Sequence, residues 1–419
     1  MEKEKIRKEA IRHHLSGKPI VSICREFGVS RKWFYKWRAR YQTGAENWYK
    51  DESKSPNTIP NKIEPSMEQL ILSVRDKLEN TQYAQIGASA IAWSIKNLGK
   101  EPPPSWTINR VLKRNGRIQE KSSKEKREKE TSYPYFTEAY YPGHIHQSDL
   151  VGPRYIKGDG RFYAFNAIDI FSHNVYSTPI RSKDDDSIVL ALIDTWKNLE
   201  VPEYLIIDNE LSFRGSNRYP HSLGKVIKLC LSMHVQPVFI PPGEPWRNGT
   251  VERFNCTFDK RFYRTERFRN YEHLQTSLKQ FIDFHNTNHI YTVNRGKTPR
   301  QIVENEKIKS NKLNQDYRLL EVLDIPYEGY IHLIRLIRSD LKLNIWGETF
   351  SMPKEVMYEY VRATIFTEFH LLKVFLGDKL ITQFEYRLPT LNQENLQVLF
   401  KEMDLYLTKL KTPVKDNKR

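Results

Sequence analysis

The order of strand and helix patterns in residues 144–263 restricts the fold of this 419-residue chain more than any other feature. Three strand-like segments come first, followed by a helix, a strand, a helix, a strand and a last helix. Strands that alternate with helices predict an α/β domain. The expected strands are 144–150, 161–171, 174–180, 203–208 and 237–240, and the expected helices are 185–199, 225–233 and one that begins near 248.

The last of these helices follows a proline-rich loop that starts at Pro241. Asn248 is expected to cap it. Glu252 lies in the first turn, where the helix dipole favours a carboxylate. This glutamate either complements the dipole or belongs to a metal site. Apolar residues recur along the helix at helical spacing, at Val251, Phe254, Phe258 and Phe262.

Two aspartates at the ends of predicted strands favour a metal site. Asp149 stands at the end of the first strand, and Asp208 ends the apolar run 205–207. A carboxylate there is costly to bury unless it binds a cation or a donor. If the first and fourth strands are neighbours, the two carboxylates repel, and a divalent metal offsets the repulsion. With Glu252 they form an all-oxygen ligand set that suits two Mg²⁺ or Mn²⁺ ions, the usual arrangement for in-line displacement at phosphorus.

Residues 1–55 are strongly basic and predict a helix-turn-helix DNA-binding domain. Half of the chain's net charge of +16 lies in its first fifty residues. Gly28 marks a tight turn, and Ser30 caps a third helix. A small helical bundle with a solvated basic face is the alternative. The third helix directs outward a set of side chains suited to phosphates and base edges, namely Arg31, Lys32, Tyr35, Lys36 and Arg38.

Residues 56–118 predict a second helical module, which begins with a linker rich in Pro, Ser, Asn and Lys. Its last helix carries Arg110, Lys113 and Arg114, which are expected to bind DNA if the module is another helix-turn-helix. A purely structural helical hairpin is the alternative. The mixed-charge stretch 119–134 is expected to be a basic linker.

Three blocks of residues 135–305 resemble the Asp-Asp-Glu triad of the retroviral-integrase-like transposases. They are Asp149 in His-Gln-Ser-Asp-Leu, Asp208 in Ile-Ile-Asp-Asn and Glu252 in Asn-Gly-Thr-Val-Glu-Arg-Phe-Asn. The resemblance implies a ribonuclease H-like core built on a mixed five-stranded sheet with helices. It extends to the N-terminus, because bacterial insertion-sequence transposases of this kind carry a helix-turn-helix there.

The resemblance implies a DNA strand transferase and endonuclease. Cleavage that depends on Mg²⁺ or Mn²⁺ would expose a 3′-hydroxyl at the transposon end, and that hydroxyl would attack target DNA. Asp149 would contact both ions, while Asp208 and Glu252 would each hold one. Asn209 and Asn248 are the supporting residues. The implied partners are double-stranded DNA, as terminal inverted repeats and as target, and further copies of the chain.

The last helix also predicts a basic stripe that holds DNA beside the scissile phosphate. It consists of Arg253, Lys260 and Arg264, spaced seven and four residues apart. Forty-three residues separate Asp208 from Glu252, more than this family's usual spacing, and the excess is assigned to a polar loop at 214–224.

Several other side chains in this region have alternative roles. Glu210 stands where the family often has glycine, so it is either a bystander, which we favour, or an additional ligand. Asp169, near the end of the second strand, is the main rival to the triad. His285 and His289 have a spacing that permits metal binding, but are expected on a polar helix face.

Residues 326–390 follow a linker at 306–325 and predict a small β-barrel. Five strand-like segments are joined by turns. Such barrels accompany transposase cores, where they bind DNA or a neighbouring subunit. Residues 391–419 predict a helix and a frayed tail. The five segments are 330–338, 343–350 with a turn at Gly347, 360–365, 371–376 and 379–386.

Composition narrows the function further. No apolar run of about eighteen residues exists, so no membrane span is expected. Cys24, Cys230 and Cys256 are scattered, which fits core thiols in a reducing compartment. With the resemblance, this predicts a cytoplasmic, nucleoid-associated bacterial protein. An active recombinase is the main prediction. A catalytically silent DNA-binding protein derived from a transposase, or a ribonuclease H-type hydrolase, is the alternative.

Overall fold

The computed structural model describes residues 2–52, 63–118, 133–215, 221–306, 311–317 and 328–388. Most of each predicted linker and all of the predicted C-terminal helix and tail lie outside these ranges, as do residues 216–220 of the predicted insertion. Contacts divide the chain after Pro65 into two compact units. Each unit is described by itself.

The first unit is a three-helix bundle. Ile23 and Phe34 are fully buried between the helices, together with Ala10 of the first helix. The Ser30 hydroxyl accepts a hydrogen bond from the Trp33 amide at 3.1 Å and caps the third helix, as its sequence predicts. The helices are α1 (Glu2–Leu15), α2 (Ile20–Glu26) and α3 (Arg31–Gln42).

The second unit begins with the predicted second helical module. Its helices are α4 (Pro65–Asn80), α5 (Ala88–Asn97) and α6 (Ser105–Arg114). Tyr83, between α4 and α5, is buried and contacts the rings of Phe262, Phe281 and Phe284. This aromatic contact attaches the module to the helices that cover the sheet.

The sheet at the centre of the second unit confirms the predicted strand order. The first three strands pair antiparallel to one another, and the next two run parallel to the first. They lie side by side in the order β3-β2-β1-β4-β5. Their bounds are β1 (Ile145–Ile156), β2 (Gly160–Asp169), β3 (Val175–Ile180), β4 (Tyr204–Ile207) and β5 (Gln236–Phe239).

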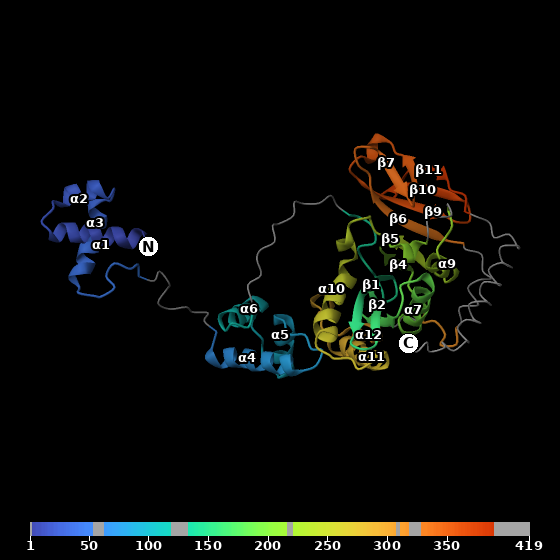
Figure 1. Ribbon diagram of the computed structural model, residues 1–419, viewed down its shortest axis with the longest axis horizontal. Helices are drawn as coiled ribbons and strands as arrows, with labels where there is room; N and C mark the ends of the chain where they lie inside the picture. The colour runs from blue at the N-terminus through green and yellow to red at the C-terminus, as the bar shows by residue number, and fades with distance from the viewer. Residues whose placement is uncertain are drawn as a thin grey trace, which may run out of the picture. The chain divides into compact units, whose positions relative to one another are not determined.

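Helices cover both faces of this sheet (Figure 1). On one face α7 (Asp185–Asn198) and α9 (Lys225–Ser232) pack through Trp196 and Ile227. On the other, α10 (Gly249–Phe258) and α11 (Tyr271–Asn288) pack through a cluster of phenylalanines. None of the described helices has the length and apolar composition needed to cross a membrane. The short elements are α8 (Leu211–Arg214), η1 (Pro245–Asn248), η2, a π-helical turn (Asp259–Tyr263), η3 (Thr292–Asn294), α12 (Pro299–Asn305) and η5 (Lys354–Val356).

The C-terminal strands extend the core sheet. β6 pairs in parallel with β5, so β9, β10 and β11 follow in a nine-stranded sheet. The predicted barrel is therefore not confirmed, since within residues 328–388 no pairing joins the end strand β11 back to β6. Alternation reveals strands but not their neighbours. The strands are β6 (Tyr330–Leu336), β7 (Lys342–Ile345), β8 (Glu348–Ser351), β9 (Tyr360–Phe366), β10 (Leu371–Leu376) and β11 (Lys379–Glu385).

The segment 343–350 is a hairpin, with its turn at Gly347 as expected. β7 and β8 pair antiparallel as a separate two-stranded sheet. Trp346 and Gly347 at the turn both have positive φ, 46° and 101°. Two consecutive residues of this kind reverse the chain.

Candidate active site

The two predicted catalytic aspartates lie beside each other where β4 ends. β1 and β4 are parallel, with Gln147 opposite Ile206. Continuing this register by two residues places Asp149 opposite Asp208. The prediction that Asp149 ends its strand is wrong, because β1 remains paired with β2 and continues to Ile156. Asp149 is nevertheless next to the end of the shorter strand β4.

Both aspartates have raised pKa values. For Asp149, burial raises the pKa most, and the charges of Glu252 and Glu210 raise it further, against hydrogen bonds from Leu150 and Asn255 that lower it. Burial likewise raises the pKa of Asp208, and the charges of Asp149 and Glu210 contribute. Asp149 is therefore within electrostatic range of both Asp208 and Glu252.

A side chain of β1 holds the helix that carries Glu252. The Oε1 atom of Gln147 accepts hydrogen bonds from the amides of Thr250 (3.0 Å) and Val251 (3.1 Å), in the first turn of α10. Asn248, predicted to cap this helix, makes no side-chain cap and instead donates to the Ser148 carbonyl at 3.0 Å. One strand thus supplies Asp149 and fixes the start of the Glu252 helix.

Asn255 orients Asp149 directly. Its Nδ2 atom donates to Oδ2 of Asp149 at 2.7 Å, while its Oδ1 atom accepts from Asn166 at 2.7 Å. Asn166 in turn accepts from the Ser177 hydroxyl at 2.5 Å. The sequence did not single out Asn255, although it lies three positions after Glu252 and so shares the helix face of that glutamate.

These carboxylates suit a hard divalent cation, because all of their ligand atoms are oxygens. The positive charge of the cation would also offset the burial and the mutual repulsion that raise the pKa values of Asp149 and Asp208. In the described part of the chain, no three His, Cys, Asp or Glu side chains surround one point as a formed metal site. Asp149 accepts from the Leu150 amide and from Asn255, and Asp208 accepts from the Glu210 amide. Each of these carboxylates keeps further lone pairs that can bind a cation while these donors hold its orientation.

The two rival carboxylates are engaged elsewhere. Glu210 forms an ion pair with Lys183, Nζ to Oε1 2.6 Å. Asp169 pairs across the sheet with His146, three residues along β1 from Asp149, which is about 10 Å in a strand. Its oxygens accept from the Gly143 and Ser172 amides, and burial raises its pKa to about 6. Asp169 thus stabilises the turn after β2.

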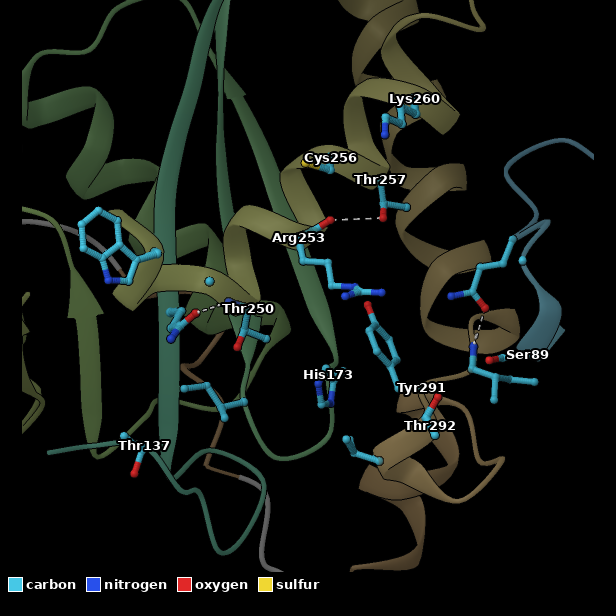
Figure 2. A pocket seen from close by; sticks show the side chains of 18 of the residues that line it. Ser89, Thr137, His173, Thr250, Arg253, Cys256, Thr257, Lys260, Tyr291 and Thr292 are labelled. Carbon is cyan, nitrogen blue, oxygen red and sulfur yellow. Dashed lines mark hydrogen bonds between the residues drawn. The ribbon is translucent and has the colours of Figure 1, made fainter. Parts of the chain in front are cut away.

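A cavity of about 1250 Å³ lies along α10. Its walls also include residues 85–90, at the start of α5, and residues 290–293, after α11. Figure 2 shows Arg253 extending from α10 toward Tyr291. Of the described residues that line the cavity, none is a triad carboxylate, but Gln147 is one of them. Four arginine or lysine side chains line it, namely Arg247, Arg253, Lys260 and Arg261.

The predicted basic stripe is therefore only partly right. Arg253 and Lys260 face the same cavity, but Arg264 lies 3.7 Å from Asp259, outside the cavity wall. The π-helical turn η2 widens the helix by one residue and changes which side chains share a face. Arg261, which the spacing did not select, takes a place in the wall. Cys256 also lines the cavity and is exposed, so the prediction of a core thiol is wrong for it.

The other predicted DNA-binding residues belong to two helices. On α3, Arg31, Lys32, Tyr35 and Lys36 are exposed and Arg38 is half-buried, as expected of a recognition surface. On α6, Arg110 lies over the Trp106 ring at 5.1 Å, beside Lys113. Arg114 donates its Nε hydrogen to Glu68 of α4 at 2.8 Å, so it stabilises the helical module internally.

His285 and His289 are buried, which corrects the prediction of a polar helix face. Nε2 of His285 lies 2.8 Å from the Tyr291 hydroxyl, and Nε2 of His289 lies 3.1 Å from the Tyr83 carbonyl. Burial lowers the pKa of both, to about 4 for His289. His289 therefore joins the end of α11 to the second helical module, while His285 joins α11 to the segment that follows it.

We expect Gln147→Leu to destabilise the second unit by about 1–3 kcal/mol, because it leaves two buried amides of α10 without an acceptor. Denaturant unfolding would measure the loss. Gln147→Glu, which keeps an acceptor oxygen at the helix N-terminus, serves as the control and is expected to lose less. Equal stability of the leucine variant and the natural chain would contradict this role.

Comparison with protein families gives two matches. The integrase core domain matches residues 233–299, and a homeodomain-like domain matches residues 1–49. No curated protein matches the chain.

Three of the solved structures that match this chain come from retroviral integrases. The catalytic core of HTLV-2 integrase in complex with magnesium is 19% identical, with 39% of this chain and 99% of that chain covered and a TM-score of 0.31. A simian T-cell lymphotropic virus intasome in complex with a PP2A regulatory subunit is 15% identical, with coverages of 66% and 84% and a TM-score of 0.35. The catalytic core of BIV integrase is 17% identical, with coverages of 39% and 94% and a TM-score of 0.30. With an integrase core domain behind a homeodomain-like domain, the chain fits a transposase of the integrase-like superfamily, as its sequence predicts.

Proposed function

We propose that this chain is a DNA transposase that cleaves transposon ends in a divalent-metal-dependent reaction and transfers the 3′-hydroxyl to target DNA. The observation that carries the proposal is the position of Asp149 on β1, which is beside Asp208 by the parallel register with β4 and is hydrogen-bonded to Asn255 of the helix that carries Glu252. The integrase core domain match adds support for residues 233–299, which include Glu252.

In this proposal Asp149, Asp208 and Glu252 would hold two Mg²⁺ or Mn²⁺ ions. When bound, the ions would activate the attacking group, which is water in cleavage and the 3′-hydroxyl in strand transfer, and stabilise negative charge at the phosphate. Asn255 orients Asp149, and Gln147 holds the first turn of the Glu252 helix. Through these hydrogen bonds, Asn255 and Gln147 keep the Asp149 and Glu252 carboxylates at a fixed separation. Glu210, neutralised by Lys183, is a bystander.

The proposed substrate is double-stranded DNA. The exposed face of α3 binds the terminal inverted repeat, and the second helical module contributes Arg110 and Lys113. The basic cavity along α10 holds backbone phosphates of the strand that is cut. Two ends must be held together in transposition, so the active form on DNA contains more than one copy of the chain.

The decisive experiment uses the purified full chain and a labelled duplex that carries the terminal repeat flanking its own gene. With Mg²⁺ we expect a nick that leaves a 3′-hydroxyl, and joining of that end to a second duplex. Chelation of the metal is expected to stop both. Specific binding without any cleavage would instead identify a catalytically silent DNA-binding protein.

Removing the cavity charges is expected to weaken DNA binding. Arg253→Gln with Lys260→Gln should reduce affinity about tenfold and lower the slope of log K against log salt by about 2, since each lost phosphate contact contributes about 0.9. The matched control is Arg264→Gln with Arg267→Gln, the same charge change at exposed positions that do not line the cavity. Equal losses in both variants, measured by fluorescence anisotropy, would contradict a role for the cavity.

A further inference from the structure

A buried arginine of the C-terminal strands reaches the loops of the candidate active site. Arg335 on β6 is 6% exposed, and burial lowers its pKa to about 10. Its guanidinium donates to Oδ1 of Asn209 at 2.8 Å and to the carbonyls of Ile240 (3.3 Å), Ile334 (2.9 Å) and Asn344 (3.3 Å). These acceptors are all neutral oxygens. Burying the Arg335 charge is costly, and these hydrogen bonds offset that cost. They also join β6 to the loops at Asn209 and Ile240, which lie far from it in the sequence.

Two of these contacts fix the turn that carries Asp208. Asn209, the next residue, accepts from Arg335 through its side chain and donates from Nδ2 to the Ile240 carbonyl. Its own carbonyl accepts from Nε of Arg214 at 3.1 Å. The turn after β4 is therefore held to the end of β5 and to β6 at once.

A second C-terminal residue fixes the loop that leads into α10. The Tyr360 hydroxyl on β9 donates to the Glu244 carboxylate at 2.9 Å and accepts from Arg247 at 3.0 Å. Arg247 also donates from Nε to Glu244 at 3.0 Å. These residues lie just before and within η1, the turn that continues into the Glu252 helix.

We propose that β6 and β9 position the active site, with Arg335 fixing the Asp208 turn and Tyr360 fixing the approach to the Glu252 helix. The two anchors come from strands joined by seven paired positions, from Tyr330 with Phe366 to Leu336 with Tyr360. They therefore move as one rigid body and set the separation of Asp208 from Glu252. This inference rests on the proposed function, and it makes the C-terminal strands part of the catalytic unit.

The first test replaces Arg335 by methionine, a side chain of similar length without charge or donors. We expect Mn²⁺ binding to the DNA-free protein, measured by electron paramagnetic resonance, to weaken about tenfold or more, and strand cleavage to fall by a similar factor. The matched control is Arg338→Met, an exposed arginine three residues farther along. It is expected to bind Mn²⁺ and cleave as the natural chain does. A variant that merely lost folded protein would bind fewer ions at unchanged affinity, so the dissociation constant separates positioning from stability.

The second test keeps the fold intact. Tyr360→Phe removes only the hydroxyl, and we expect cleavage to fall about tenfold with duplex affinity unchanged. Tyr358→Phe, at an exposed position two residues earlier, is the control. This variant carries the test if Arg335→Met does not fold.

The outcomes separate this inference from the proposed function. If the natural chain cleaves and both Arg335→Met and Tyr360→Phe bind Mn²⁺ and cleave as it does, the positioning role is overturned and the proposed function stands. If the natural chain does not cleave but Arg335→Met still weakens Mn²⁺ binding, the proposed function fails and the positioning role stands.

Discussion

Replacing Glu252 by glutamine is expected to reduce Mg²⁺-dependent strand cleavage by at least roughly 1000-fold, which corresponds to about 4 kcal/mol of activation free energy. The substitution keeps the shape of the side chain and the hydrogen bonds of α10, but removes the charge that one ion needs. Asp149→Asn and Asp208→Asn should have the same effect. Gel analysis of a labelled transposon end would measure the rate, and binding of the duplex should persist in all three variants.

Glu210→Gln is the matched control for this prediction. It removes one carboxylate charge near Asp149, as Glu252→Gln does, but from a residue paired with Lys183. We expect the cleavage rate of Glu210→Gln to stay within about tenfold of the rate of the natural chain. A neighbouring charge changes the electrostatic potential at the site but does not bind the ion directly. Loss of cleavage in this variant would make Glu210 an additional ligand, and full cleavage by the triad variants would disprove the assignment of the active site.

Removing the basic face of α3 is expected to have the largest effect on recognition of the transposon end. We expect specific binding to weaken roughly 100-fold in the triple variant Arg31→Gln, Lys32→Gln and Lys36→Gln. A contact to a base edge contributes about 1–3 kcal/mol. A contact to a phosphate contributes through the release of about one counterion. The slope of log K against log salt should fall by up to about 3. Titration of the labelled terminal repeat at several salt concentrations would measure both changes.

The control for this prediction makes the same charge change on another helix. Lys3→Gln, Lys5→Gln and Arg12→Gln lie on exposed positions of α1. We expect the control to lower affinity for specific and random duplexes alike by a small factor, through net charge alone. If the two triple variants lose the same amount of specific binding, α3 is not the recognition helix.

The core of the fold could be predicted from the sequence because its signals are local. The apolar run 205–207 and the strand-like segment 161–171 locate β4 and β2 to within two residues. The proximity of Asp149 and Asp208 required only the additional assumption that β1 and β4 are neighbours, which the pairing confirms. Ser30 capped α3 as expected, since a serine before a helix has few other structural roles.

The residues that position the site could not be predicted, because their partners lie in segments remote in sequence. Gln147 is 103 residues from Thr250, and Arg335 is 126 residues from Asn209. A glutamine in a strand has no preferred partner until the packing of a helix against that strand is known. The cap of α10 was consequently assigned to Asn248, the residue expected by local rules alone.

The C-terminal half of the sheet illustrates the same limit at the level of topology. Five or six short strands with turns are compatible with a closed barrel or with an extension of the core sheet. The choice depends on the pairing of Val238 with His332 and of Phe239 with Leu333, two contacts between segments almost a hundred residues apart. The hydrophobic periodicity of either segment does not predict that β5 and β6 pair.

The pairing of β5 with β6 has a consequence for how the chain matures during synthesis. Until residues 330–336 leave the ribosome, β5 is an edge strand whose backbone groups on one side have no partner, and such edges promote association with other chains. The Asp208 turn meanwhile lacks Arg335. A partly synthesised chain would therefore expose an unpaired strand edge and an unformed candidate active site together, and the candidate site can form only after residues 330–336 have emerged.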